Sequence, residues 1–377
     1  MKETGSVTRR NVLTAAAAAI SMSAVRGSAA NSAPTVGLIG CGGRGGSITK
    51  ALVENTNARL VAMCDLFEEQ IERAKKRIGV QDARTYNDLH KLLESDVDAV
   101  IIATPVFLHA EHFEAAVKAG KHIYVEKPAG SDVESCKRIM RAADGADRKL
   151  NITMGFQRRY AEMYLKAKAA HDAGEIGQIN MAHAHFLKSG GSPRAIDEPR
   201  PTSLIDKSRR WHNWTELSGD LIVENNVHCI DVLNWFLGGH PLSAVGLGGK
   251  KEARPGDMRD NNNVAYAYAD GVQASLAGST LGSNGYREVH EQFFGTNGML
   301  ETSELHWRHY KGRDDDKLEK STRSTTTDSM AAFVKRIVEG KPENTGVRGA
   351  ESTLTAILGR MAMDARREVT WDEMMNT

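Results

Sequence analysis

The 377-residue sequence is poor in cysteine, proline and aromatic residues, and it carries almost no net charge. Its four cysteines show neither a dense disulfide pattern nor paired metal-ligand spacing, which argues against a disulfide scaffold and a zinc finger. Lysine and arginine (49) nearly balance aspartate and glutamate (48), so we expect no nucleic acid and no membrane surface as a partner. The sequence also lacks an apolar run long enough to span a bilayer, which takes about 20 residues.

The first 30 residues have the features of an export signal. Arg9 and Arg10 precede an alanine-rich, mildly apolar run to about Ala24, and Ser28-Ala29-Ala30 is a candidate cleavage site. This pattern resembles a twin-arginine signal, which exports proteins already folded. We therefore expect residues 1–30 to be removed and the protein to be periplasmic or secreted. The alternative is a disordered alanine-rich tail in which the two arginines are accidental.

A glycine-rich turn, Gly40-Cys41-Gly42-Gly43-Arg44-Gly45, lies between an apolar strand pattern at Thr35–Ile39 and a helix pattern that begins near Ser47. Asp65 ends a second apolar run, 20 residues after Gly45. Strand, G-x-G-x-x-G turn, helix and terminal acid at this distance form the dinucleotide-binding fingerprint. The alternative is a glycine turn in an unrelated α/β protein.

The fingerprint also indicates which cofactor binds. Asp65 is expected to accept hydrogen bonds from ribose hydroxyls and to repel a 2′-phosphate, which favours NAD over NADP. Further contacts are expected from residues that follow other strands, because ligands bind beyond the carboxyl ends of a parallel sheet. The predicted cofactor-binding residues are Gly40, Gly42, Gly43, Arg44, Gly45, Asp65, Thr104, Pro105, His109, Glu126 and Lys127.

Two patterns divide the chain after the signal into two domains. Residues 31–153 alternate short apolar runs with helix patterns, which predicts an α/β domain with a parallel (Rossmann) sheet. Residues 154–377 contain strand patterns separated by Gly and Asn turns, which predicts an α+β domain on a mostly antiparallel sheet. We expect an unstructured loop over the site at 189–210 and a linker at 321–328. The predicted strands cover 35–39, 60–64, 99–103, 122–125, 151–154, 179–187, 244–248, 264–269, 272–279 and 289–295.

A second group of polar residues lies in the apolar stretch from Gly219 to Asp231. On a helix, Glu224, His228 and Asp231 fall at positions i, i+4 and i+7, within one narrow stripe. A buried imidazole beside a carboxylate has a pKa that its surroundings can tune for proton transfer. The alternative is a hydrogen-bonded core network that ties the helix to the sheet.

Together these motifs resemble the glucose–fructose oxidoreductase/inositol dehydrogenase/MocA family. They comprise the glycine fingerprint, Ala103-Thr104-Pro105, Glu126-Lys127-Pro128, Gly155-Phe156-Gln157-Arg158-Arg159-Tyr160 and the Glu224/His228/Asp231 helix, with Val369-Thr370-Trp371-Asp372-Glu373 at the end. The resemblance implies an NAD(P)-dependent enzyme of sugars or polyols and an open-faced sheet through which a homo-oligomer forms. It also implies that Lys127 stabilises the developing alkoxide and that His228 takes the hydroxyl proton. Glu224 replaces the family's more common aspartate and is expected to orient His228.

Other polar and aromatic residues are predicted to bind the substrate. They are Arg159, Tyr160, His183, His185, Trp211, His212, Asn225 and Asp231. Arg159 and Tyr160 could instead cap the domain junction. His183 and His185, with His228 and Glu224, have the residue types of a metal site, but we predict no metal.

Three functions are compatible with these patterns. The first is an NAD(P)-dependent oxidoreductase that transfers a hydride from a secondary hydroxyl carbon of a carbohydrate or polyol, with NAD tightly bound. The second is a redox-neutral, NAD-dependent glycoside hydrolase that proceeds by oxidation, elimination, hydration and reduction of a glycoside. The third is a non-catalytic sugar- or nucleotide-binding protein.

Overall fold

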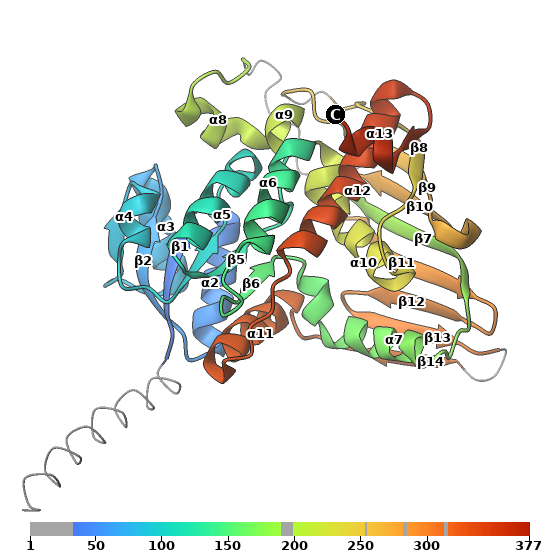
Figure 1. Cartoon of the computed structure of the whole chain (residues 1–377), viewed down its shortest axis with the longest axis horizontal. Helices are drawn as coiled ribbons and strands as arrows, with labels where there is room; N and C mark the ends of the chain where they lie inside the picture. The colour runs from blue at the N-terminus through green and yellow to red at the C-terminus, as the bar shows by residue number, and fades with distance from the viewer. Residues whose placement is uncertain (1–32, 190–198, 253–254, 282–284, 313–315) are drawn as a thin grey trace, which may run out of the picture.

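The structure, a computed structural model, contains one six-stranded sheet and one nine-stranded sheet with helices packed on them (Figure 1). It describes residues 33–189, 199–252, 255–281, 285–312 and 316–377. The predicted export signal, residues 1–30, lies outside the described residues. Within those ranges, no helix is long and apolar enough to cross a membrane.

The first sheet is entirely parallel and has the strand order β3-β2-β1-β4-β5-β6. Its strands are β1 (Thr35–Ile39), β2 (Arg59–Cys64), β3 (Arg84–Tyr86), β4 (Ala99–Ile102), β5 (His122–Val125) and β6 (Ile152–Met154). The helices between them are α2 (Gly43–Asn55), α3 (Glu68–Ile78), α4 (Leu89–Leu93), α5 (His109–Lys118) and α6 (Val133–Asp144). The central strands are almost purely apolar because helices cover both faces of the sheet. The predicted Rossmann domain is confirmed.

The second sheet has the order β14-β13-β12-β11-β7-β10-β9-β8-β15. Its strands are β7 (Ile179–Lys188), β8 (Ser243–Gly249), β9 (Asn261–Ala267), β10 (Gln273–Ser279), β11 (Arg287–Gly295), β12 (Met299–Ser303), β13 (His306–Tyr310), β14 (Lys317–Lys320) and β15 (Val369–Thr370). Only the pair β7–β10 is parallel. The predicted mostly antiparallel sheet is therefore confirmed.

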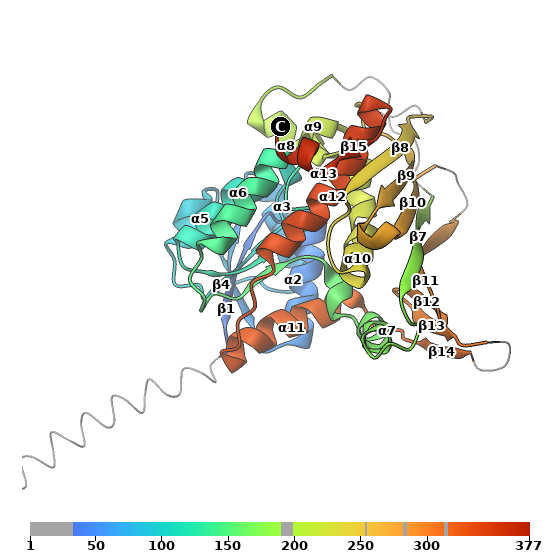
Figure 2. The ribbon, with the colours of Figure 1, turned by 45° about the vertical axis from the view of Figure 1, so that its right-hand side comes forward.

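Helices cover one face of this second sheet and leave the other face open (Figure 2). The covering helices are α7 (Glu162–Asp172), α10 (Val227–Leu237) and α12 (Gly346–Ala365). On β7, Ala182, Ala184 and Phe186 are buried on the covered face, so His183 and His185 lie on the open face. This alternation decides which residues of the strand can reach the candidate site.

After strand β14 the chain returns to the first domain before it rejoins the second sheet at β15. Helix α11 (Thr325–Glu339) packs against α2, and Phe333 meets the Tyr124 ring edge-on at 5.7 Å. Because α11 begins at Thr325, the predicted linker is shorter than 321–328. The chain outside the two sheets also forms α8 (Leu204–Arg210), α9 (Thr215–Ser218) and α13 (Trp371–Met375). Helix α8 corrects the prediction of a structureless 189–210 loop, of which residues 190–198 are not described.

Candidate active site at the junction of the two sheets

The glycine turn has the backbone that a dinucleotide site needs. Gly40 has φ +91°, and an added Cβ there would come within 2.6 Å of the Ala103 backbone. A Cβ on Gly45 would lie 2.0 Å from the Gly40 carbonyl oxygen. At Gly42, which caps α2, a Cβ would meet nothing within 4 Å, so a ligand can approach the backbone there. The turn and the N-terminus of α2 thus fit a pyrophosphate.

A cavity of about 780 Å³ opens from this turn along the carboxyl ends of β1, β2 and β4. Its wall includes Gly42, Arg44, Asp65, Thr104 and Pro105, all predicted cofactor residues. The Asp65 carboxylate accepts hydrogen bonds from the backbone N–H groups of Cys41 (2.7 Å) and Phe67 (3.0 Å). Burial raises the pKa of Asp65, while these hydrogen bonds act in the opposite direction. The acid is fixed at the cavity wall, as contact with ribose hydroxyls requires.

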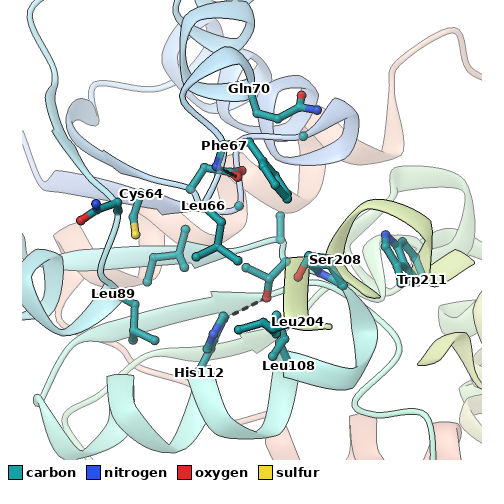
Figure 3. Close-up of a pocket in the computed structure, with 18 of the residues that line it drawn as sticks. Cys64, Leu66, Phe67, Gln70, Leu89, Leu108, His112, Leu204, Ser208 and Trp211 are labelled. Carbon is teal, nitrogen blue, oxygen red and sulfur yellow. Dashed lines mark hydrogen bonds between the residues drawn. The ribbon is translucent and has the colours of Figure 1, made fainter. Parts of the chain in front are cut away.

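Helix α8 forms the opposite wall of this cavity. Figure 3 shows Leu204, Ser208 and Trp211 across the cavity from Leu66 and Phe67. The Arg209 guanidinium lies 3.9 Å from the centroid of the Phe67 ring, and it donates a hydrogen bond of 2.9 Å to Glu69. A segment that follows the first strand of the second sheet therefore covers the nucleotide cavity. No local sequence pattern predicts this wall, and Trp211, a predicted sugar-binding residue, lies in it instead.

Arg44 connects the glycine turn to the other strand ends. Its Nε donates to Glu126 at 2.8 Å, and a terminal nitrogen donates to Gln157 at 2.7 Å. Glu126 itself is 4% exposed. The Glu126 carboxylate is thus committed to Arg44 and supports the cavity wall from behind rather than facing a ligand.

His109 does not line the nucleotide cavity. Its ring is buried, with Nδ1 2.7 Å from the Pro128 carbonyl oxygen and Nε2 2.9 Å from the Thr104 carbonyl oxygen. Both ring nitrogens are therefore occupied within the protein. The predicted cofactor contact of His109 is therefore wrong. The ring instead connects the segments that follow β4 and β5.

Lys127 and Glu224 meet where the two domains join. Lys127, two residues past the end of β5, has Nζ 2.5 Å from the Glu224 carbonyl oxygen and 3.3 Å from its Oε1. Both side chains are largely buried, with 12% and 16% exposed. Burial alone raises the pKa of Glu224, but the charges of Lys127 and His212 outweigh it and hold that pKa below its usual value. The carboxylate is ionised and neutralises the ammonium.

The backbone around Glu224 differs from the predicted continuous α-helix. Residues Ile222–Asn226 form a π-helical turn, and α10 begins only at Val227. A π-turn inside a helix is rare and is found mainly at functional sites. The hydrogen-bond and ion-pair partners of the Glu224 side chain are Lys127 and His212, not His228. Glu224 therefore orients Lys127, which corrects the predicted role of orienting the imidazole.

His228 supplies a neutral imidazole in this region. Its Nδ1 is buried and has no hydrogen-bond partner among the described residues, and its ring meets Phe156 edge-on at 6.4 Å. Burial, reinforced by the positive charges of Lys127 and Arg158, lowers the pKa of His228 well below its usual value. A ring held neutral in this way is unprotonated near neutral pH, as a general base must be before the reaction.

Three predicted substrate residues make contacts within the protein instead of facing a substrate cavity. Arg159 donates to both carboxylate oxygens of Asp231 at 2.9–3.0 Å, and Ser352 donates to the same carboxylate at 2.8 Å. Asp231 is 1% exposed, so its carboxylate faces no cavity. The Tyr160 ring lies under the Arg336 guanidinium at 5.2 Å. Arg159, Tyr160 and Asp231 hold the domain junction together, which is the alternative that the sequence allowed for the first two.

His183 and His185 lie on the open face of the second sheet, away from Lys127 and His228. His183 is hydrogen-bonded to Ser275, and His185 Nδ1 lies 2.7 Å from Glu288. The predicted substrate contact of both residues is therefore wrong, because the candidate substrate cavity lies on the helix-covered face and these two side chains lie on the open face. His185, Glu288 and His290 place ligand-type atoms within 4.8 Å of one another, but partly exposed groups of this kind are common without a metal.

A smaller cavity of about 340 Å³ lies at the π-turn, on the covered side of the second sheet. The predicted residues His212 and Asn225 both line it. Lys188, the last residue of β7, lines it as well and was missed by the sequence analysis. The polar walls of this cavity make it the candidate substrate site.

Comparisons with known proteins agree with this geometry. The model of an oxidoreductase family with an NAD-binding Rossmann fold matches residues 35–154, and a GFO/IDH/MocA C-terminal domain matches residues 164–301. An inositol 2-dehydrogenase of Rhizobium meliloti is 30% identical over 261 residues, which cover 67% of this chain and 72% of that protein. A myo-inositol 2-dehydrogenase of Thermotoga maritima is 24% identical, with 90% of this chain and 99% of that protein covered.

Two solved structures share the fold. Levoglucosan dehydrogenase in complex with NADH and levoglucosan has a TM-score of 0.75 at 20% identity. A scyllo-inositol dehydrogenase from Lactobacillus casei with bound NAD(H) and scyllo-inositol has a TM-score of 0.70 at 22% identity. In both cases the match covers 90% of this chain and 99% of the other.

Proposed function

Because this chain belongs to the GFO/IDH/MocA family of NAD(P)-dependent oxidoreductases, we propose that it is an NAD-dependent dehydrogenase of a secondary hydroxyl group on a sugar or polyol. One observation carries the proposal. Lys127, which follows strand β5 of the first domain, is in contact with Glu224 of the second, and the Lys127 charge acts on the neutral ring of His228.

These side chains divide the chemistry between them. When bound, NAD⁺ supplies the acceptor for the hydride that leaves the substrate carbon. His228 is neutral and accepts the hydroxyl proton. The Lys127 ammonium donates to the oxygen as negative charge develops on it, and Glu224 holds the ammonium in place from the other side.

Turnover on a panel of polyols and sugars tests this function. We expect the full chain to form NADH from NAD⁺ with an inositol, an anhydrosugar or a hexose. His228→Asn and Lys127→Met should each abolish most of this activity. If no member of a broad panel yields NADH, and none changes the redox state of bound cofactor, the proposed dehydrogenase activity is wrong.

We further propose that NAD stays bound through many turnovers. The wall that α8 adds over the nucleotide cavity supports this retention. Retention also fits export to the periplasm or the exterior, which the Arg9-Arg10 signal predicts. Outside the cytoplasm, a pool of free nicotinamide cofactor should be lacking. Mass analysis of the purified protein should find one nicotinamide dinucleotide per chain after gel filtration. Protein that emerges from gel filtration free of nucleotide would contradict the proposed retention of NAD.

A retained cofactor also favours the second candidate function, the redox-neutral glycoside hydrolase. In such a reaction the cofactor ends each cycle in its starting state, so it never needs to leave. Purified protein should then release the aglycone from aryl or natural glycosides without added NAD. Steady NADH formation from free sugars, with no glycoside cleaved, would decide for the dehydrogenase.

The open face of the second sheet is our proposed surface for homo-oligomer formation. Val245 and Leu247 on β8 are 47% and 71% exposed there, and Met181 on β7 is 39% exposed. Exposed apolar groups on a broad sheet face favour association with a second copy. Leu247→Glu should lower the molar mass measured by light scattering; an unchanged mass would point to another surface.

A further inference from the structure

Lys188 is a charged group that the proposed dehydrogenase chemistry does not use. Its place at the end of β7 follows the alternation of that strand, which puts it on the covered face with Ala184 and Phe186. Its Nζ lies 4.6 Å from the centroid of the Phe186 ring, and the residue is partly buried. The side chain lines the 340 Å³ cavity with His212 and Asn225.

Other cations in or near the wall of this cavity already have partners, and Lys250, which also lines the cavity, donates to the Gly256 carbonyl oxygen. Lys127 is paired with Glu224 at 3.3 Å. Arg259 is paired with Asp220 at 2.6 Å, and Arg287, opposite Lys188 in the sheet, with Glu304 at 3.0 Å. By contrast, the Lys188 ammonium makes no ion pair or hydrogen bond with any residue in the described ranges. Among the described residues, the Lys188 ammonium in this wall therefore has no counter-ion.

The surroundings make such an unpaired charge unfavourable in the free protein. Burial lowers the pKa of Lys188, and the charges of Arg287 and Lys127 add to this effect, while Glu224 and Glu304 oppose it. A partly buried cation of this kind is stabilised strongly by an anion that enters the same cavity. A volume of 340 Å³ falls in the range of small-ligand sites, roughly 300–1,000 Å³.

We propose that Lys188 binds the carboxylate of an acidic sugar, so that the preferred substrate is a hexuronate or a related sugar acid. This inference rests on the proposed dehydrogenase function, because it assigns the reacting hydroxyl group to Lys127 and His228. The carboxylate itself is unchanged in the reaction. The secondary alcohol becomes a ketone: its C–H hydrogen leaves with both bonding electrons to NAD⁺, and its O–H proton passes to His228.

The single unpaired charge favours a carboxylate over a phosphate ester. A phosphate monoester carries close to two negative charges at neutral pH and is bound best by several donors. Arg259, also in the cavity wall, is held by Asp220 and Asp364, and the Lys250 ammonium donates to the Gly256 carbonyl oxygen. The Lys188 ammonium matches a group with one negative charge.

Equilibrium binding and turnover on matched ligands test the inference. The ligands are D-glucuronate, D-galacturonate, the two matching hexoses and glucose 6-phosphate, each offered to the purified full chain. We expect at least one uronate to bind about 10- to 100-fold more tightly than its hexose, as a charge-assisted hydrogen bond provides. Lys188→Met should remove most of this preference, mainly through KM, and Lys188→Arg should retain part of it. Lys320→Met removes the same charge at the end of exposed strand β14 and should leave the preference unchanged.

The outcomes separate this inference from the proposed function. A uronate that binds through Lys188 but yields no NADH supports the anion subsite and contradicts the dehydrogenase. Turnover of hexoses and uronates with equal kcat/KM overturns the inference and leaves the dehydrogenase in place. Preference for the phosphate ester, binding of none of these ligands, or a preference that survives in Lys188→Met would each overturn it too.

Discussion

The ammonium of Lys127 lies 3.3 Å from the carboxylate of Glu224, although the two residues are 97 positions apart in the sequence. Lys127 follows strand β5 of the first sheet, and Glu224 lies in a π-turn of the second domain. The contact unites, in one place, groups that a hydride-transfer site needs: a cation, a fixed counter-ion and a neighbouring neutral imidazole.

Replacing Lys127 by methionine removes the charge that stabilises the developing alkoxide. We expect kcat for NADH formation to fall by about 10²–10³, with a smaller change in NAD affinity. Glu224→Gln keeps the size of the side chain but loses the ion pair, and it should lower kcat less than Lys127→Met does. If Lys127→Met retains wild-type kcat, the ammonium has no role in the chemical step.

His228 should determine the acid limb of the pH profile. Because its pKa is held well below 6.5, the imidazole stays neutral and able to accept a proton at mildly acidic pH. We expect kcat/KM to remain level as the pH falls through 6.5 and to drop only at lower pH. His228→Asn should lower kcat by about 10²–10⁴ and remove this limb. A limb centred near 6.5 in the wild type would mean that the ring is not buried in the working enzyme.

Asp65 should set the choice between NAD and NADP. Its carboxylate is fixed by backbone N–H groups at the cavity wall, where it opposes a 2′-phosphate. We expect Asp65→Ser to raise the NADP:NAD ratio of kcat/KM by about tenfold or more. An unchanged ratio would place the adenosine ribose elsewhere in the cavity.

The contact between Arg209 and Phe67 should slow release of the cofactor. Arg209 and Glu69 are about half exposed, so their ion pair adds little to the stability of this wall. Most of the stabilisation comes from the contact between the guanidinium and the Phe67 ring. We expect Arg209→Ala to speed NADH release, measured by fluorescence in stopped flow, by about three- to tenfold. Glu69→Gln should have a smaller effect. Arg73→Ala, an exposed arginine on α3, serves as the charge control.

Part of this site could be predicted from the sequence, and the reasons are physical. The parallel strands are almost purely apolar, and the turn needs glycine where φ is positive or a Cβ would clash, so both leave a sequence pattern that predicts them together with Asp65. Alternation along β7 showed that His183 and His185 share a face, but not that helices cover the opposite one. Helix α8 has seven residues, none of them buried, and it is placed by contacts with Phe67 and Glu69 that no local pattern records.

The buried pair of Arg158 and Glu291 should stabilise the second domain. Both side chains are at most 1% exposed and lie 2.5 Å apart, and Thr302 also donates to Glu291 at 2.8 Å. Arg158→Met leaves an uncompensated carboxylate and should lower the free energy of unfolding by about 3–5 kcal/mol. The double variant Arg158→Met/Glu291→Leu should recover much of that loss in thermal melts. Equal destabilisation of the single and double variants would contradict this account.

Reduction of bound cofactor in a single turnover tests the central claim most directly. Protein purified with its nucleotide, in the NAD⁺ form, is mixed with sugars, polyols and uronates while NADH absorbance is followed. We predict that at least one ligand produces about one equivalent of NADH per chain in the wild type, and that His228→Asn, loaded to the same extent, produces it far more slowly. Equal rates in both proteins, or no NADH in either at saturating ligand, would contradict hydride transfer assisted by the Lys127–His228 site.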